Sequence, residues 1–326
     1  MSPQNFRKQA LTLLTVGVLA AVPCAAQTPT YPNKPLTFVI GSTPGGILDT
    51  VGRIVAKGLE KMGQPVVVQN QPGAGSSLAM ATVASAPADG YTIAMVPTSY
   101  AINPSVYTKL PFDTKRDFLP ISHSVNLANV LVVNSSFPAK SLQEFIDLAR
   151  KKPGEITYGS AGNGQSNHLS AENFKAAAGI QMIHVPYKGS SAAMTDLLGG
   201  NISAMFVDTL TATPQIKAGK LRALATSGNT RLVALPEVPT FAESGLPNFD
   251  ANSWLGVVIR KGTPPEIAAR IASAAAGVMH EPEVRNRLVA MGVQPVGSTP
   301  EQFVTFLDTQ FESYAAAVKR AGVKLD

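Results

Sequence analysis

Apolar runs of strand length alternate along this chain with segments whose apolar residues recur at helical spacing. The runs are LTFVIG, PVVVQN, YTIAMVP, VLVVNS, EITYGSA, MIHVPY, ISAMFVD and LRALATS. Strands that alternate with helices favour parallel sheets covered by helices. A chain of 326 residues is long enough for two such domains. The sequence therefore predicts an α/β protein with parallel sheets.

The first 26 residues have the composition of a secretory signal peptide. Arg7 and Lys8 precede an apolar run, and the small residues Cys24 and Ala26 favour cleavage before Gln27. The run is too short for a transmembrane helix, which needs about 20 apolar residues. Lipid attachment at Cys24 is the alternative, which the preceding proline disfavours. Because Cys24 is the only cysteine, the mature chain has no disulfide, and we expect a protein of the bacterial periplasm.

The charges exclude a nucleic-acid interface. The sequence has 27 Lys and Arg against 21 Asp and Glu, and these residues are scattered singly. A nucleic-acid-binding protein concentrates basic residues on one face, which this pattern does not predict. The mild positive charge is at most a weak attraction for small anions.

A glycine turn follows the first apolar run, in the stretch VIGSTPGGILDT. Strand, glycine turn and helix in this order are typical of an anion site at a helix N-terminus. Asp49 lies in the first turn of that helix. We expect it to accept loop N–H groups and hold the turn in shape; the alternative is that it repels a second anion or binds a ligand amino or hydroxyl group.

A second strand, turn and helix with glycines occurs at residues 155–179, where Ser166 or Asn167 is expected to cap the helix. Three segments after residue 264 are predicted as helices that each have proline in the first turn. We place them around the first domain's sheet, so that this domain is discontinuous.

Catalytic and nucleotide-binding motifs are missing or incomplete. The P-loop pattern does not occur, and GAGSSL at Gly73 matches only part of a dinucleotide fingerprint. Residues 41–45 have the spacing of a serine elbow but Thr43 at its centre. The four histidines lack metal-type spacing. His168 is a candidate base, although a surface or cleft-rim histidine that forms hydrogen bonds is the simpler interpretation.

Nine motifs in series resemble the receptors of tripartite tricarboxylate transporters, often called Bug receptors. They are, in order, YPNKPLTFVIGSTPGGILDTVGR, PVVVQNQPGAGSSLAM, ADGYTIAM, AINPSVYTKLPFD, NVLVVNSSFPAKSLQEFI, YGSAGNGQSNHLSAENFK, HVPYKGSSAAMTDLLGG, AGKLRALA and LPEVPTFAESG. The resemblance runs over nearly the whole mature chain without a large gap.

This resemblance implies a type II periplasmic-binding-protein fold, in which two α/β domains joined by crossover strands close on a ligand between them. Domain 1 would comprise residues 27–127 and 253–326, and domain 2 residues 128–252. The implied function is a monomeric receptor without cofactor, metal or enzymatic activity that delivers its ligand to membrane permease subunits.

The implied ligand is a small organic acid: a di- or tricarboxylate, an acidic amino acid or an aromatic carboxylate. Main-chain and hydroxyl groups of the two turns would hold its carboxylate, often through waters. The ligand-binding residues carried over come from the first turn, the second turn and the cleft rim. They are Thr43, Gly45, Gly46 and Asp49; Ser160, Ala161, Gly162, Asn163 and Ser166; and Thr98, Ser99 and Asp208.

Some positions depart from the family pattern. Ile47 and Leu48 are larger and more apolar than usual, so they either pack or favour a ligand with an aliphatic or aromatic body. The usual MFD is MFVD here, which puts the role of Asp208 in doubt. Lys188 is either a ligand-binding cation or a solvated charge. Alternative functions are ligand presentation to a sensor kinase and, with His168 as base, an envelope hydrolase.

Overall fold

The computed structural model describes residues 31–187, 189–228, 230–249 and 251–324. The chain divides into a first unit, Met1–Tyr31, and one compact unit, Pro32–Asp326, to which every element below belongs. The predicted signal peptide, residues 1–26, and Lys188 lie outside the described residues. Across the described part of the chain, no helix combines the length and the hydropathy needed to cross a membrane.

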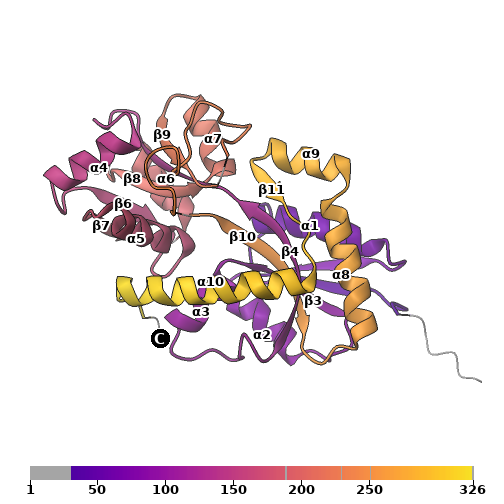
Figure 1. Cartoon of the computed structure of the whole chain (residues 1–326). Coiled ribbons are helices and arrows are strands. Elements are labelled where there is room, and N and C mark those ends of the chain that lie inside the picture. The colour runs from indigo at the N-terminus through magenta and orange to yellow at the C-terminus, as the bar shows by residue number, and fades with distance from the viewer. Residues whose placement is uncertain (1–30, 188, 229, 250, 325–326) are drawn as a thin grey trace, which may run out of the picture. The chain divides into compact units, whose positions relative to one another are not determined.

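The first sheet has six strands in the order β11-β4-β10-β3-β1-β2. Strand β1 pairs in parallel with β2 and β3, whereas β10 is antiparallel to β3 and β4. The strands, labelled in part in Figure 1, are β1 (Leu36–Ile40), β2 (Val66–Asn70), β3 (Thr92–Pro97), β4 (Phe118–Leu127), β10 (Ser253–Arg260) and β11 (Val293–Pro295).

The second sheet has five strands in the order β7-β6-β8-β5-β9. Strand β6 is parallel to β7 and β8, and β5 is antiparallel to β8 and β9. Its strands are β5 (Asn129–Asn134), β6 (Thr157–Ser160), β7 (Ile183–Pro186), β8 (Ala204–Asp208) and β9 (Leu221–Thr226).

Both sheets are mixed, so the expectation of parallel sheets is wrong in part. The antiparallel pairs involve the strands near which the chain passes from one sheet to the other and, in the first sheet, also β11, which is antiparallel to β4. Strand β4 ends at Leu127 in the first sheet and β5 begins at Asn129 in the second, and β10 returns to the first sheet at Ser253. These strands run against their neighbours because each is a connection as well as a sheet member. The domain boundaries at 127/128 and 252/253 stay a prediction.

Helices from both ends of the chain pack on the first sheet. Helix α8 contacts α1 and β4, and α10 contacts α3 and β4, as Figure 1 also indicates. All three C-terminal helices have proline in the first turn, as the sequence predicts. The helical segments are α1 (Ile47–Glu60), η1 (Ala74–Ser76), α2 (Ser77–Ser85), α3 (Ser99–Val106), α8 (Pro265–Met279), α9 (Pro282–Ala290) and α10 (Pro300–Ala321).

The remaining helices pack on the second sheet: α4 (Leu142–Lys151), α5 (Ser166–Ala178), α6 (Ser190–Leu198) and α7 (Thr209–Lys217). Helix α10 also reaches this side, since it contacts α5 and Arg320 donates a hydrogen bond to Asn173. Leu169 of α5 shares a buried cluster with Phe303 and Leu307 of α10. The longest C-terminal helix therefore ties together elements of both sheets.

Candidate functional site

A cleft of about 330 Å³ lies between the two sheets, at the start of α1 and α5. The first sheet's side contributes the first glycine turn, the loop at residues 73–76 and the start of α3, and the second sheet's side contributes the second glycine turn and the end of β8. Cavities of this size are typical of small-molecule sites. The apolar residues that line it are Ile47, Leu48, Pro97, Leu127, Ala161, Phe206, Val207, Trp254 and Leu255.

The carboxylate of Asp49 supports the first glycine turn through hydrogen bonds. Its Oδ2 accepts from the Gly45 main-chain N–H at 3.0 Å and from Arg53 Nε at 3.0 Å. Its Oδ1 accepts from Asn70 Nδ2 at 2.9 Å, and the same amide reaches the Ser42 carbonyl. Burial raises the pKa of Asp49, but the hydrogen bonds outweigh it and lower the pKa to about 2. These bonds support the interpretation of Asp49 as the residue that holds the turn.

The loop at residues 73–76 closes against the first turn. Ser76 Oγ donates to the Gly41 carbonyl at 3.0 Å, and a Cβ on Gly41 would lie 2.3 Å from the Ser76 Cβ. The Gly75 carbonyl accepts from Ser99 Oγ at 2.7 Å and from Asn103 Nδ2 at 3.0 Å. The partial dinucleotide fingerprint is therefore a structural loop that packs closely against Gly41, and its own glycines, Gly73 and Gly75, adopt positive φ of 133° and 57°.

Side chains of α5 shape the second turn. Asn167 Oδ1 accepts from the Ala161 and His168 N–H groups at 3.2 and 3.0 Å, and His168 Nδ1 accepts from the Gly164 N–H at 3.1 Å. The expectation that Ser166 or Asn167 is the helix cap is wrong, because Gln165 occupies that position without a side-chain bond. Asn167 instead fixes the loop that precedes the helix.

Behind this turn lies a buried stack of rings. The His168 and His184 rings lie 3.8 Å apart and nearly parallel, and Tyr158 stacks on His184 at 4.9 Å. Burial lowers the pKa of His184 to about 4 and also lowers that of His168. His168 is 4% exposed, so the expectation of a surface or cleft-rim histidine is wrong.

Ser160 and His184 have the spacing of a nucleophile and base, with Ser160 Oγ 2.6 Å from His184 Nε2. Ser160 is fully buried, and its hydroxyl also bonds the Gly162 carbonyl and N–H within its own turn. Neither residue lines the cleft. The pair therefore holds the turn in shape, and no substrate in the cleft reaches it.

Comparison with known proteins identifies the chain. The model of the tripartite tricarboxylate transporter family receptor matches residues 51–323. The chain belongs to this family. It is 34% identical to the protein BugT of Bordetella pertussis, over 96% of each chain.

Two solved structures resemble the receptor closely. The periplasmic binding protein BugD aligns with a TM-score of 0.77 and 30% identity over 90% of this chain and 99% of that one. The R. palustris protein Rpa4515 with adipate aligns with a TM-score of 0.80 and 31% identity over 90% and 99%. The periplasmic-binding-protein fold is therefore confirmed. The family is one of periplasmic solute-binding receptors rather than enzymes.

The structure brings five of the twelve predicted site residues of this receptor to the cleft: Thr98, Ser99, Ala161, Ser166 and Asp208. The other seven do not line it. Asp49, Ser160 and Gly162 form hydrogen bonds within the two turns. The remaining four are exposed: Thr43, Gly45, Gly46 and Asn163. Ligand contact by any of the twelve stays a prediction.

Even the predicted residues at the receptor's cleft have internal partners. Thr98 Oγ1 accepts from the Trp254 N–H at 2.9 Å, and so fixes the edge of β10. Asp208 caps α7, since its two oxygens accept from the Thr211 N–H and hydroxyl at 2.8 and 2.9 Å. Asp208 is nevertheless one of the residues that line the cleft.

Several cleft residues of the receptor were not predicted from the sequence. Ser42 Oγ is buried and has no hydrogen-bond partner among the residues that the structure describes. Asn129 and Ser253 lie where the chain changes sheets, and their side chains bond each other at 3.1 Å. The predicted domain boundaries are the signal that would have found these two. The other glycines and polar residues that line the cleft without having been predicted are Gly41, Gly73, Gly75, Ser76, Gln165, Asn167 and Ser190.

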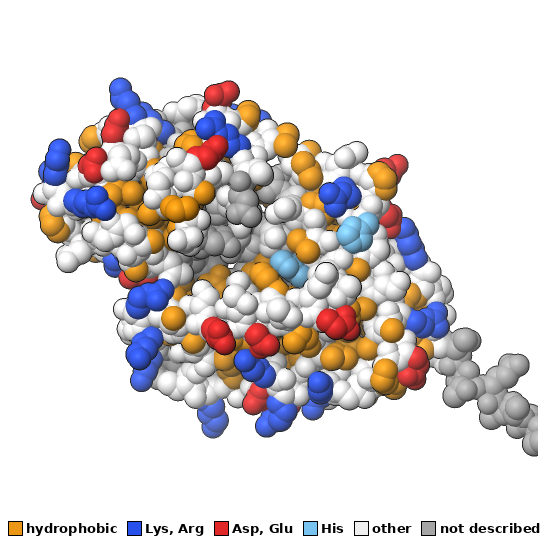
Figure 2. Space-filling view, in the orientation of Figure 1, with side chains coloured by type: hydrophobic (Ala, Val, Ile, Leu, Met, Phe, Trp, Pro, Cys, Tyr) orange, Lys and Arg blue, Asp and Glu red, His pale blue; other side chains and the backbone are white. Residues whose placement is uncertain are grey.

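The receptor's cleft is nearly free of charge. Among the described residues that line it, none is lysine or arginine, and Asp208 is the one acid. No group of three His, Cys, Asp or Glu suited to a metal ion occurs in the described ranges. On the face drawn in Figure 2, basic and acidic side chains are interspersed rather than gathered by sign. An anion in the cleft would be held by hydroxyls, amides and main-chain N–H groups.

Proposed function

We propose that this protein binds a small organic acid in the cleft, closes on it in the periplasm, and delivers it to the permease subunits of a tripartite tricarboxylate transporter. One observation carries the proposal: the N-termini of α1 and α5, which pack on different sheets, both line the cleft beside the unpartnered Ser42 hydroxyl. The adipate-bound relative supports the same class of ligand.

Main-chain donors are available at both helix ends. The first N–H groups of a helix have no acceptor inside it, which applies to Ile47 and Leu48 in α1 and to Ser166 in α5. A hydrogen bond to a charged group contributes about 1.5 to 3 kcal/mol, and a helix N-terminus adds about 0.3 to 1 kcal/mol. Four or five such donors, less the cost of association, reach the 8 kcal/mol or so of a micromolar ligand.

The cleft walls suit an acid with an apolar body. Ile47 and Leu48 line the cleft from the first sheet's side and Val207 from the second's. A second carboxylate on the ligand would find no cation at Asp208, and the Asp208 carboxylate would repel it. We therefore expect an acid whose far end is apolar, hydroxylated or aminated to bind more tightly than a diacid of the same length.

Thermal unfolding with matched ligands tests the proposal. Each of a set of mono-, di- and tricarboxylates is compared with its methyl ester and its amide. An acid at a hundredfold excess over its dissociation constant stabilises the protein by about 2.7 kcal/mol. A stabilising acid whose ester and amide have no effect supports the proposal. Stabilisation by an ester or a sugar and by none of the acids would refute it.

The proposal excludes turnover of the ligand. The envelope hydrolase considered from the sequence needs a nucleophile that faces the cleft, whereas Ser160 lies buried behind the second turn. Chromogenic esters incubated with the protein are expected to hydrolyse at the rate of the buffer alone. Hydrolysis that disappears in His184→Ala would contradict this expectation.

A further inference from the structure

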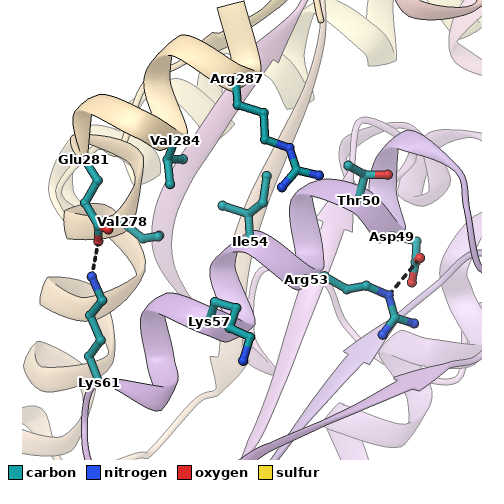
Figure 3. A pocket seen from close by; sticks show the side chains of 10 residues that line it. All are labelled: Asp49, Thr50, Arg53, Ile54, Lys57, Lys61, Val278, Glu281, Val284 and Arg287. Atoms are coloured by element: carbon teal, nitrogen blue, oxygen red, sulfur yellow. Dashed lines mark hydrogen bonds and ion pairs between the residues drawn. The ribbon is translucent and has the colours of Figure 1, made fainter.

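A second cavity, of about 380 Å³, lies between α1 and the helices α8 and α9. We call it the outer groove. Figure 3 shows its floor and rim. The floor is apolar, from Ile54, Val278 and Val284, and the rim carries the cations Arg53, Lys57, Lys61 and Arg287. Two acids, Asp49 and Glu281, also line the groove. The groove shares no lining residue with the cleft, although Asp49 lies at the start of α1, next to the first glycine turn.

We propose that the outer groove is a docking surface for an acidic, extended segment of a protein partner. The cations favour a segment over a small anion, because they are arranged in a row. Arg53, Lys57 and Lys61 follow at four-residue steps and so spread over about 12 Å of one helix face. An extended chain covers that length with about four residues, whereas a small anion meets only one or two of the cations.

The ion pairs already present leave these cations available. Arg53, Lys57 and Lys61 pair with Asp49, Glu60 and Glu281. Their side chains are 51%, 79% and 63% exposed, and ion pairs at such exposure are weak, because water screens them. Arg287 reaches from α9 toward α1 in Figure 3. Within the described residues it has no ion pair, and it offers a bidentate donor to an incoming carboxylate.

The groove is connected to the first turn through one atom. Arg53 Nε donates to Asp49 Oδ2, which also accepts from the Gly45 N–H. A partner carboxylate that binds Arg53 competes for it with Asp49 and weakens the support of the turn. Occupation of the outer groove and of the cleft are therefore coupled, and the coupling is reciprocal. The coupling rests on the proposed function, whereas the docking surface does not.

The docking surface is tested with fluorescently labelled hexaglutamate as probe, followed by anisotropy at low salt without any organic acid. The groove variant is the double substitution Lys57→Gln and Arg287→Gln, which leaves Arg53 and Asp49 unchanged. The matched control is Lys151→Gln with Lys217→Gln, two exposed lysines on helices of the second sheet. Both doubles remove two positive charges, so they separate local contact from net charge.

We expect the groove double variant to bind hexaglutamate about tenfold more weakly than wild type, and the control double to bind like wild type. Inorganic phosphate is expected to compete only at much higher concentration than the peptide. Three results would overturn the proposal: no peptide binding, equal weakening in both doubles, or phosphate competing as well as the peptide. Thermal unfolding of both doubles verifies that they fold.

The coupling is tested separately, with the acid that stabilises the protein most. We expect a saturating concentration of that acid to change the affinity for hexaglutamate at least threefold, since both ligands act on the Asp49 hydrogen bonds. Equal peptide affinity with and without the acid would overturn the coupling. If no acid binds, the proposed function fails, while the peptide measurement still decides the docking surface.

Discussion

Replacement of Asp49 by asparagine separates support of the turn from contact with the ligand. The carboxylate accepts three hydrogen bonds, at 3.0, 3.0 and 2.9 Å, from donors on both of its sides. An asparagine has one acceptor oxygen, so its amide must face either the Gly45 N–H or the Asn70 amide. At least one donor then loses its acceptor, at a cost of about 1.5 to 3 kcal/mol. Loss of the exposed Arg53 pair adds less than about 1 kcal/mol.

If ligand binding has to restore the shape of the turn, that cost appears as an affinity roughly ten- to a hundredfold weaker. Calorimetric titration with adipate, citrate and glutamate is the assay, and we expect all the acids that bind wild type to weaken by a similar factor. A loss confined to the amino-bearing ligand would show that Asp49 contacts the ligand. Unchanged affinity for every acid would refute the account of the turn.

The control for this substitution is Asp113→Ala, which removes the acceptor oxygen of another turn. Asp113 also accepts main-chain N–H groups in a turn, from Lys115 and Arg116 at 3.0 and 2.9 Å, but it lines neither the cleft nor the outer groove. We expect it to lower the melting temperature without a change in affinity. A loss of affinity in this variant would mean that the assay reports general destabilisation.

Two further predictions concern single side chains, and a third concerns two buried or half-buried histidines. Ser42→Ala is expected to weaken the acid about tenfold in calorimetry without lowering the melting temperature, because the hydroxyl has no internal partner; a stability loss without an affinity loss would contradict this. Asp208→Asn keeps a good helix cap and is expected to favour dicarboxylates over monocarboxylates, and an unchanged ratio of dissociation constants would refute the repulsion argument. Burial lowers the pKa of His123 and of His184 to about 4 from 6.5, so the unfolded chain binds more protons between these values. The free energy of unfolding, measured in urea, is therefore expected to be full above pH 6.5 and to fall as the pH drops toward 4, by at most about 1.4 kcal/mol per pH unit for each histidine; a flat profile would contradict it.

The sequence predicts the helices and the parallel strands because their periods are local. Leu48, Val51 and Ile54 lie on one face of α1 and are buried, as their spacing indicates. Strand β4 was not predicted, since it carries polar residues such as Ser122, His123 and Ser124 that are nevertheless buried. Strand β10 was also missed, although its run SWLGVVIR carries a local apolar signal. The polar residues of β4 are buried because β4 pairs with β10 and because the loop around Ser298 packs on it. The local sequence of β4 does not indicate this burial.

The two turns were predicted correctly as elements, but not the direction of each side chain within them. For Asp49 the sequence predicts that it accepts N–H groups of its glycine turn, and its hydrogen bonds in the structure agree with this. For Ser160 only the packed structure shows that the hydroxyl faces His184 and not the cleft. Ser42 was missed as a cleft residue, since nothing in the local sequence distinguishes it from the neighbouring Thr43. Orientation within an irregular turn depends on the tertiary neighbours, which pattern reasoning does not see.

The most direct test of the central claim is a crystal structure of the protein with the acid that gives the largest thermal shift. Two anion sites are proposed in this molecule, the cleft, whose described lining has no lysine or arginine, and the outer groove with its four cations; simple charge attraction favours the groove. The account predicts a carboxylate in the cleft, within about 3 Å of Ser42 Oγ or of main-chain N–H groups at the start of α1 or α5. A carboxylate bound by Arg53 and Arg287, with the cleft unoccupied, would contradict it.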